Sequence, residues 1–350
     1  MNRIYGSCTG LLAFLLLCTC AGQEPLSPDG LIRLGTRAGG YEGSATRASV
    51  NDLAGLAAVG DKVGVYGVVT TRTDALYAPL TSEWNGTPLM DNVRTTGIDA
   101  ATGMLFWNGD YTYPLEENRR VKFCVYHPYA PVGTGGDNYV EAVAGQSPVL
   151  HFRLTGAEDV MWVRPVTGSR REAPSALLFE HKLTQLRFRL VDDEGEFAGV
   201  TVTGLAFNGV NTASTLNLET GELGGWSAAQ AAVPFPLKSP AAISGTTEMP
   251  QVLAGEVMLQ PGQPVFRLTL TTDSRGDYPG IEIRPSGGET VFAAGRSYMV
   301  TLKFRDRTAV ALSAKVMPWV MDGYGEGLSL IHISEPTRPI SSSYAVFCLK

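Results

Sequence analysis

Glycine and proline interrupt this chain along its whole length. Its 350 residues include 40 glycines and 21 prolines, spread through the sequence so that few stretches are left for a long helix. Short strands between turn residues are typical of a β-sandwich or a β-barrel. The sequence therefore predicts an all-β fold. Alternating or β-branched runs that favour strands occur at 62–70, 120–126, 186–191, 199–207, 265–271 and 298–304.

The run at 186–191 shows the alternation most clearly. Leu186, Phe188 and Leu190 point to one face of an extended strand, and Arg187 and Arg189 point to the other. This pattern is that of a half-buried antiparallel strand. No helical period is sustained anywhere, which excludes a fold of alternating strands and helices.

Two short segments, 50–56 and 227–232, are the places where the sequence favours a short helix. A polar segment with two prolines at 165–175 predicts a domain boundary. We therefore expect an N-terminal β-sandwich over 38–175 and a C-terminal one over 176–327.

The N-terminus has the proportions of an export signal. An apolar run at 11–17 is far shorter than the roughly 20 residues needed to span a membrane. It is followed by Cys20, as in a bacterial lipoprotein signal, so we expect residues 1–19 to be removed and Cys20 to be acylated. Cys18 is a weaker candidate, and an ordinary signal cut at 21–22 is the alternative without a lipid.

The C-terminal residues have a different origin. Residues 328–338 (LSLIHISEPTR) and 343–349 (SYAVFCL) are translations of the two constant parts of a common sequencing adapter. We therefore expect residues 328–350 not to be native, and to pack against nothing. The natural ending of the protein is then a different one.

Charge and cysteine content narrow the class of protein. The chain has a formal net charge of −6, which argues against nucleic acid as a partner. Outside the signal and the tail, only Cys20 and Cys124 remain. With Cys20 acylated, no disulfide framework can form, so packed apolar cores must stabilise the fold.

Motifs for catalysis and metal binding are absent from the sequence. His127, His151 and His181 have no ligand-like spacing, and we expect neither a metal nor a cofactor. The acidic clusters 158–159 and 192–194 are expected to be solvated rather than to hold calcium. A distant pair of carboxylates would still permit a surface glycoside hydrolase, which stays open as an alternative.

Several conspicuous side chains have structural interpretations. We expect His181, between two apolar residues on a strand, to be a hydrogen-bonded structural histidine. Cys124 is expected to be a buried small apolar residue. Core packing, rather than a carbohydrate platform, is predicted for the large aromatic residues near strand ends, Trp107, Tyr113, Tyr126 and Tyr129.

An ordered set of short segments resembles one known family. Each segment is weak alone, but their order is specific, and the likeness extends over roughly residues 10–327. The chain resembles the fimbrillin-like lipoproteins of Bacteroidales, the subunits of type V pili. The segments are Thr-Arg-Ala at 36–38 and 46–48, VGVY at 63–66, LFW at 105–107, FCVY at 123–126, LFEHKL at 178–183, LNL at 216–218, AGRSY at 294–298 and a late Trp319.

The resemblance implies two tandem transthyretin-like sandwiches of Greek-key type and a non-enzymatic structural or adhesive role. In such proteins a protease cuts after an arginine and removes the first strand, and a strand of the next subunit then fills the emptied groove. Residues 20–37 would be the tether with this removable strand. Its candidates are Leu31, Ile32 and Leu34, and the candidate cut sites are Arg37 and Arg47.

The same resemblance implies partners and a location. Other fimbrial subunits would bind by β-strand addition, and an acyl chain would hold the protein at the outer membrane, on the cell surface. A host or bacterial surface ligand is compatible with an adhesive subunit. A surface glycan-binding lipoprotein is the alternative function, and tip, shaft and anchor roles stay open.

Overall fold

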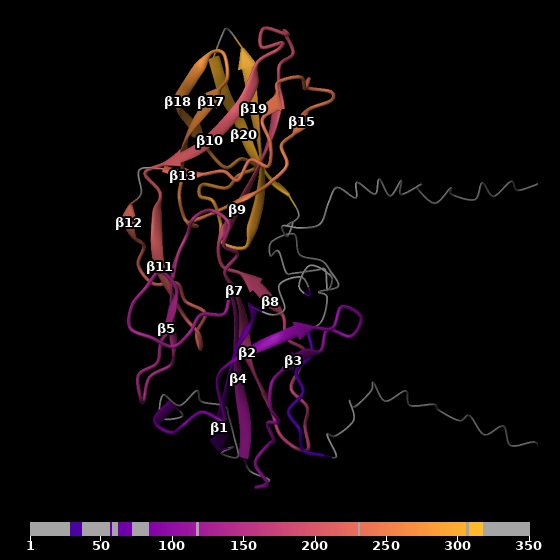
Figure 1. Cartoon of the computed structure of the whole chain (residues 1–350), viewed down its shortest axis with the longest axis vertical. Helices are drawn as coiled ribbons and strands as arrows, with labels where there is room; N and C mark the ends of the chain where they lie inside the picture. Colours follow the sequence, from indigo (N-terminus) through magenta and orange to yellow (C-terminus); the bar gives the residue numbers. More distant parts are fainter. Residues whose placement is uncertain are drawn as a thin grey trace, which may run out of the picture.

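The structure is a computed structural model of the chain. It describes residues 29–36, 57, 62–71, 84–116, 119–229, 232–305 and 308–317. Figure 1 shows an elongated molecule in which two bodies follow one another along the longest axis. All named elements in the described residues are β-strands, which confirms the all-β prediction. Nowhere in that part of the chain is a helix long and apolar enough to cross a membrane.

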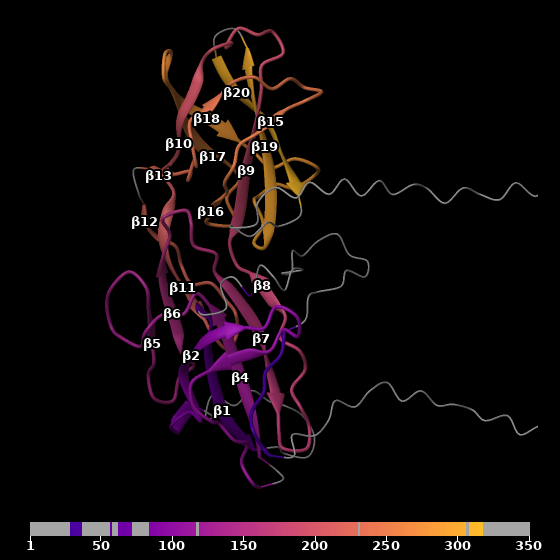
Figure 2. The same ribbon diagram turned by 45° about the vertical axis from the view of Figure 1, so that its right-hand side comes forward.

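The N-terminal body consists of two sheets, which Figure 2 shows as separate layers. The first has the strand order β3-β2-β1-β4-β7-β8, and the second has the order β12-β11-β6-β5. The first sheet contains β1 (Gly64–Thr71), β2 (Met90–Ile98), β3 (Leu105–Trp107), β4 (Arg119–His127), β7 (Met161–Gly168) and β8 (Phe179–His181). The second contains β5 (Tyr139–Glu141), β6 (Val149–Arg153), β11 (Asn211–Asn217) and β12 (Ser227–Ala229).

The C-terminal body is a sandwich of two five-stranded sheets. One has the order β13-β10-β17-β18, with β14 beside β10, and the other has the order β15-β9-β19-β20, with β16 beside β9. The first contains β10 (Thr201–Asn208), β13 (Ala232–Pro234), β14 (Ala241–Ala242), β17 (Phe266–Thr272) and β18 (Gly276–Ile283). The second contains β9 (Thr184–Val191), β15 (Gln251–Val252), β16 (Val257–Leu259), β19 (Arg296–Arg305) and β20 (Thr308–Met317).

Alternating side chains form the core of the C-terminal body. The apolar face of β9, with Leu186, Phe188 and Leu190, packs against β10 and β17 as the sequence predicts. The pairing of β9 with β19 is parallel, whereas the other strand pairs of this body are antiparallel. The sandwich is therefore antiparallel except at its central pair.

The N-terminal body has two apolar cores, one on each face of its six-stranded sheet. Val121, Phe123 and Val125 of β4 belong to one core. Cys124 and Tyr126 of the same strand belong to the other. Since both faces are covered, β4 is a continuous buried run from its third residue onward. Cys124 is fully buried, as predicted, and takes part in no disulfide within the described part of the chain.

Two segments that follow the predicted boundary at 165–175 pair with N-terminal sheets. β8 pairs with β7, so the chain enters the C-terminal body only after His181. β11 pairs with β6, although β10 and β13 on either side of the β11–β12 pair lie in the C-terminal body. The chain thus leaves the C-terminal body after β10, forms β11 and β12 in a sheet of the N-terminal body, and returns at β13.

The short helix predicted at 227–232 is wrong. Residues 227–229 form β12 and residues 232–234 form β13. Ala229 pairs with Asn211 and Ser227 pairs with Ala213, while β13 pairs with β10. Backbone pairing in two sheets therefore overrides the local helix preference of the alanines. The other predicted helix, at 50–56, lies outside the described residues.

Candidate functional site

The first described segment, residues 29–36, lies in extended form along the edge of the N-terminal body. We call it the edge segment. Its backbone is bridged to Thr112 and Met104 on one side and to Leu177 on the other. It therefore pairs as a strand between β3 and the approach to β8. The hydrogen bonds run from Ile32 N to Tyr111 O (2.8 Å), Thr36 N to Gly103 O (2.8 Å), Leu105 N to Leu34 O (2.9 Å), Tyr113 N to Gly30 O (2.9 Å) and Leu177 N to Gly35 O (2.8 Å).

Side chains of the edge segment alternate between the core and the surface. Ile32 and Leu34 are 4% and 0% exposed, and both belong to the core on that face of the six-stranded sheet. Arg33 points outward and pairs with Asp29 at 2.5 Å. Leu31 is half-buried. Of the three candidate residues, Ile32 and Leu34 thus fill the groove and Leu31 lies at its rim.

Backbone approaches close the groove tightly at two places. Gly103 has φ +73°, and a Cβ there would lie 2.3 Å from Thr36 O. The Thr36 hydroxyl donates to Gly103 O at 3.0 Å. At the other end, Gly30 faces the guanidinium of Arg170, which would lie 2.9 Å from an added Cβ. The groove therefore takes small residues at its ends and aliphatic ones between them.

The edge segment closes the core beneath it. Leu105, Tyr113, Leu177 and Phe179 belong to the same apolar cluster as its two buried side chains. Full burial of an aliphatic side chain is worth about 1.5–3 kcal/mol, and each backbone hydrogen bond about 0.5–1.5 kcal/mol. The segment is therefore held by several kcal/mol, through contacts that any strand with the same alternation could make.

The other predicted site residues lie outside the described part of the chain. Cys20 precedes the edge segment, and Arg37 and Arg47 follow it. Arg37 comes directly after Thr36, the last described residue of the segment. The first candidate cut site is thus the next residue in the sequence after the edge segment.

A buried polar cluster lies where β4, β7 and β8 reach the C-terminal body. His181 Nδ1 donates to the Asp159 carboxylate at 2.9 Å, and His127 Nδ1 donates to the Asp159 carbonyl at 2.8 Å. The structural role predicted for His181 is confirmed. Burial lowers the pKa of His127, although the neighbouring Asp159 opposes the shift.

The expectation that the acidic clusters are solvated is wrong for several of their members. Asp159 holds His181, and Glu158 accepts from the hydroxyl of Thr155 at 2.6 Å. The hydrogen-bond partners of these carboxylates could not be predicted, because the sequence around a carboxylate in a loop looks the same whether the group is solvated or paired.

The second acidic cluster is also held by protein groups. Asp192 accepts from Phe197 N at 2.9 Å. Hydrogen bonds from Lys303 and Thr247 lower the pKa of Asp193 to about 2. Across the described residues, no group of three or more histidine, cysteine, aspartate or glutamate side chains is arranged to hold a metal ion.

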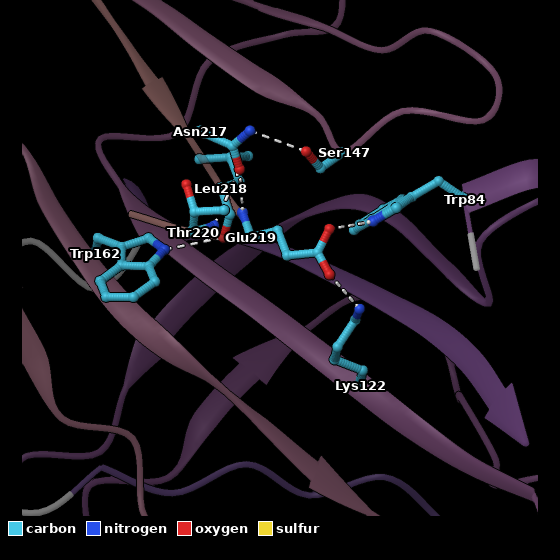
Figure 3. A network of polar contacts seen from close by, with 8 residues as sticks. All are labelled: Trp84, Lys122, Ser147, Trp162, Asn217, Leu218, Glu219 and Thr220. Atoms are coloured by element: carbon cyan, nitrogen blue, oxygen red, sulfur yellow. Dashed lines mark hydrogen bonds and ion pairs between the residues drawn. The ribbon is translucent and has the colours of Figure 1, made fainter. Parts of the chain in front are cut away.

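A third polar network joins β4 to the tip of the β11–β12 pair (Figure 3). Lys122 Nζ pairs with Glu219 Oε1 at 2.5 Å, and Trp84 Nε1 donates to Glu219 Oε2 at 2.8 Å. Sequence reasoning missed these residues, because Lys122 and Glu219 are 97 positions apart. The one signal was a lysine inside the apolar run of β4.

The predicted aromatic residues are placed mainly in cores. Tyr113 and Tyr126 are 3% and 0% exposed. Trp107 packs in part against the core beneath the edge segment. Tyr129 is half-buried and lies under the guanidinium of Arg94, 5.6 Å from its ring centre. Core packing accounts for the first three, as predicted.

Comparisons with known proteins identify the family. The profile described as fimbrillin-like matches residues 46–319, which is most of the chain. The chain belongs to the fimbrillin-like family. The predicted resemblance is confirmed. No relative was found among curated protein sequences.

Solved structures agree at the level of the fold. One neighbour is a protein from Bacteroides uniformis described as a proposed cell adhesion protein. It is 19% identical, with a TM-score of 0.52, and the match covers 83% of this chain and 100% of that one. A proposed cell adhesion protein from Bacteroides ovatus is 16% identical, with a TM-score of 0.50, over 75% of this chain and 90% of that one.

Family and fold together give a coarse function. This fimbrillin-like chain is a structural protein of a fimbrial kind, and its family is that of cell-surface appendages. The described geometry contains one feature suited to assembly, the edge segment in its groove.

Proposed function

We propose that this fimbrillin-like protein is a non-enzymatic subunit of a cell-surface fimbria that assembles by strand exchange at the groove of the edge segment. The observation that carries the proposal is the combination of backbone pairing and alternating burial in residues 29–36. Both kinds of contact can be reproduced by a strand of another subunit. Backbone hydrogen bonds would give affinity, and the pockets of Ile32 and Leu34 would select the side chains.

Cleavage after Arg37 or Arg47 would separate the edge segment from the rest of the chain. The segment would then stay in its groove through its own contacts until another strand displaces it. Acylation of Cys20 would hold the uncut chain at the outer membrane. Subunit partners and the surface location follow from the same proposal.

The test uses the purified chain and an arginine-specific protease. We expect cleavage near Arg37 or Arg47, retention of the edge segment, and its replacement by a labelled peptide with the sequence of residues 29–36. The variants Arg37→Ala and Arg47→Ala, alone and together, identify the cut site. A matched peptide with aspartate at positions 32 and 34 is the control. A cut chain that loses the segment and takes up neither peptide would rule out strand exchange at this groove.

Anchoring has its own test. Cells expressing the protein are given labelled palmitate, and the wild type is compared with Cys20→Ala. We expect label in the wild type alone. Equal label in both would place the lipid at another residue, and no label in either would exclude acylation.

A further inference from the structure

A hairpin from the C-terminal body completes the N-terminal body. We call residues 211–229, which contain β11 and β12, the bridging hairpin. β10 ends at Asn208 in the C-terminal body, and β11 begins at Asn211 in the N-terminal body. Gly209, with φ +70°, and Val210 link them. Figures 1 and 2 show β10 and β11 following one another along the longest axis of the molecule.

The bridging hairpin is held by a ladder and by a core. β11 pairs with β6 from Ala213 opposite Arg153 to Asn217 opposite Val149. Leu216, fully buried, belongs to the core between the two sheets of the N-terminal body. That core thus consists of side chains from both parts of the chain.

A buried ion pair locks the tip of the hairpin. The side chains of Lys122 and Glu219 are 7% and 14% exposed, and Lys122 Nζ also lies 5.9 Å from the centre of the Trp84 ring. Next to Glu219, the carbonyl of Leu218 accepts from Trp162 Nε1 at 2.9 Å. Both carboxylate oxygens of Glu219 and the neighbouring carbonyl are therefore satisfied by the N-terminal body (Figure 3).

The turn of the hairpin fits against an aromatic ring. Gly221 has φ +71°, and a Cβ there would lie 2.6 Å from the ring of Trp162. Glycine permits both the turn and the close contact. The tip of the hairpin is thus held by close packing against Trp162 as well as by the ion pair with Lys122.

Withdrawal of the tip would break the ion pair between Lys122 and Glu219, whose side chains are both largely buried. Loss of one partner of a buried pair is much more damaging than loss of an exposed pair. In addition, hydrogen bonds of an antiparallel ladder are perpendicular to the strands. A pull along the longest axis therefore loads the β6–β11 bonds together, in shear.

We propose that the bridging hairpin is a mechanical tie, which makes the two bodies resist tension along the molecule as a single unit. The Glu219–Lys122–Trp84 network is its lock. This inference concerns the body of the subunit, and does not depend on strand exchange at the groove of the edge segment.

Single-molecule force spectroscopy on the folded chain tests the tie. Handles are attached through Arg171→Cys, between β7 and β8 of the N-terminal body, and Ser274→Cys, between β17 and β18 of the C-terminal body. Forced unfolding reports the unfolding rate. We expect Glu219→Gln to raise this rate at a given force about tenfold or more. Asp193→Asn, which removes the pair with Lys303 inside the C-terminal body, is the matched control and should not.

A second pair of handles separates the tie from general destabilisation. With Ser274→Cys and Thr290→Cys, both in the C-terminal body, Glu219→Gln should leave the unfolding rate unchanged. An equal rise with both handle pairs, or no rise with either, would overturn the proposal.

If Glu219→Gln does not fold, a disulfide between β6 and β11 tests the tie instead. Thr215 and His151 are directly opposite each other in the ladder, at the separation that a disulfide between strands requires. The pair Thr215→Cys and His151→Cys should slow axial unfolding when oxidised and return to the wild-type rate when reduced. An oxidised protein that unfolds at the wild-type rate would show that the ladder does not resist the pull.

Discussion

The edge segment and the bridging hairpin both complete the N-terminal body, from opposite faces of the same six-stranded sheet. The edge segment contributes Ile32 and Leu34 to one core, and the hairpin contributes Leu216 and Leu218 to the other. The first is held by backbone hydrogen bonds and apolar pockets, and its Arg33–Asp29 ion pair is exposed and lies within the segment itself. The second is locked by a buried ion pair to another strand.

Under the proposed strand exchange, this difference would separate a replaceable strand from a permanent one. Apolar pockets accept any strand with the right alternation, whereas a buried charge accepts only its own partner. The comparison yields four predictions, which begin with the change that should do the most damage.

Glu219→Gln should have the largest effect on global stability. Removing one partner of a buried ion pair costs about 3–5 kcal/mol, because the remaining charge is desolvated and has lost that partner. Lys122, which is 6% exposed, would be that remaining charge. Denaturant unfolding measures the loss. Replacing both Glu219 and Lys122 with neutral residues should be milder than either single change, and a strictly additive double variant would contradict this account.

Leu34→Ala should loosen the edge segment by about 2–5 kcal/mol, the range for truncating a buried leucine. If the segment is replaceable, the loss appears as faster hydrogen exchange and proteolysis of residues 29–36 while the rest of the body stays protected. If the whole N-terminal body lost protection equally, the edge segment would be a fixed part of the fold, and the comparison with the hairpin would fail.

Acid should destabilise the fold through His127. Its pKa in the folded state is lowered from 6.5 by burial, so the unfolded state binds more protons once the pH falls below about 6.5. Stability should therefore decrease as the pH falls through that value. The groups that act on His127 are Asp159, Lys62 and His181.

Thermal unfolding between pH 8 and pH 5 measures this dependence. His127→Gln should flatten the curve, and His151→Gln, at a partly exposed position, should not. A His127→Gln curve with the wild-type slope would assign the acid sensitivity to another group.

Arg33→Ala should have the smallest effect. Arg33 and Asp29 pair on the surface, with side chains 51% and 43% exposed, where solvent screens the interaction. We expect no measurable change in unfolding or in retention of the edge segment. Release of the segment in this variant would show that the ion pair, rather than the apolar pockets, holds it.

The sequence predicted the strands better than their partners. Runs such as 186–191 and 298–304 alternate strongly, and both became central strands, β9 and β19. Their parallel pairing could not be predicted, because alternation describes one strand and not its neighbour. For the same reason, the pairing of β11 with β6 could not be predicted. Nothing in residues 211–217 indicates that they join a sheet of the N-terminal body and not one of the C-terminal body.

The functional residues, too, could be predicted only in part. Alternation at Ile32 and Leu34 identified the buried residues of the edge segment. The contacts of Glu219 could not be predicted, because the sequence around a glutamate in a turn does not distinguish a paired side chain from a solvated one. Only the fold places it beside Lys122 and Trp84.

The parallel pair of β9 and β19 has a consequence for the order in which the chain acquires its structure. Arg189 and Thr301, bonded across this pair at 2.7 Å, are 112 positions apart. Contacts between such distant residues require a large loop to close first, which slows folding. A chain that emerges from its N-terminus onward therefore cannot finish the C-terminal sandwich until β19 arrives, and the N-terminal body must wait for β11 and β12. Both bodies therefore stay incomplete until strands far along the chain have emerged.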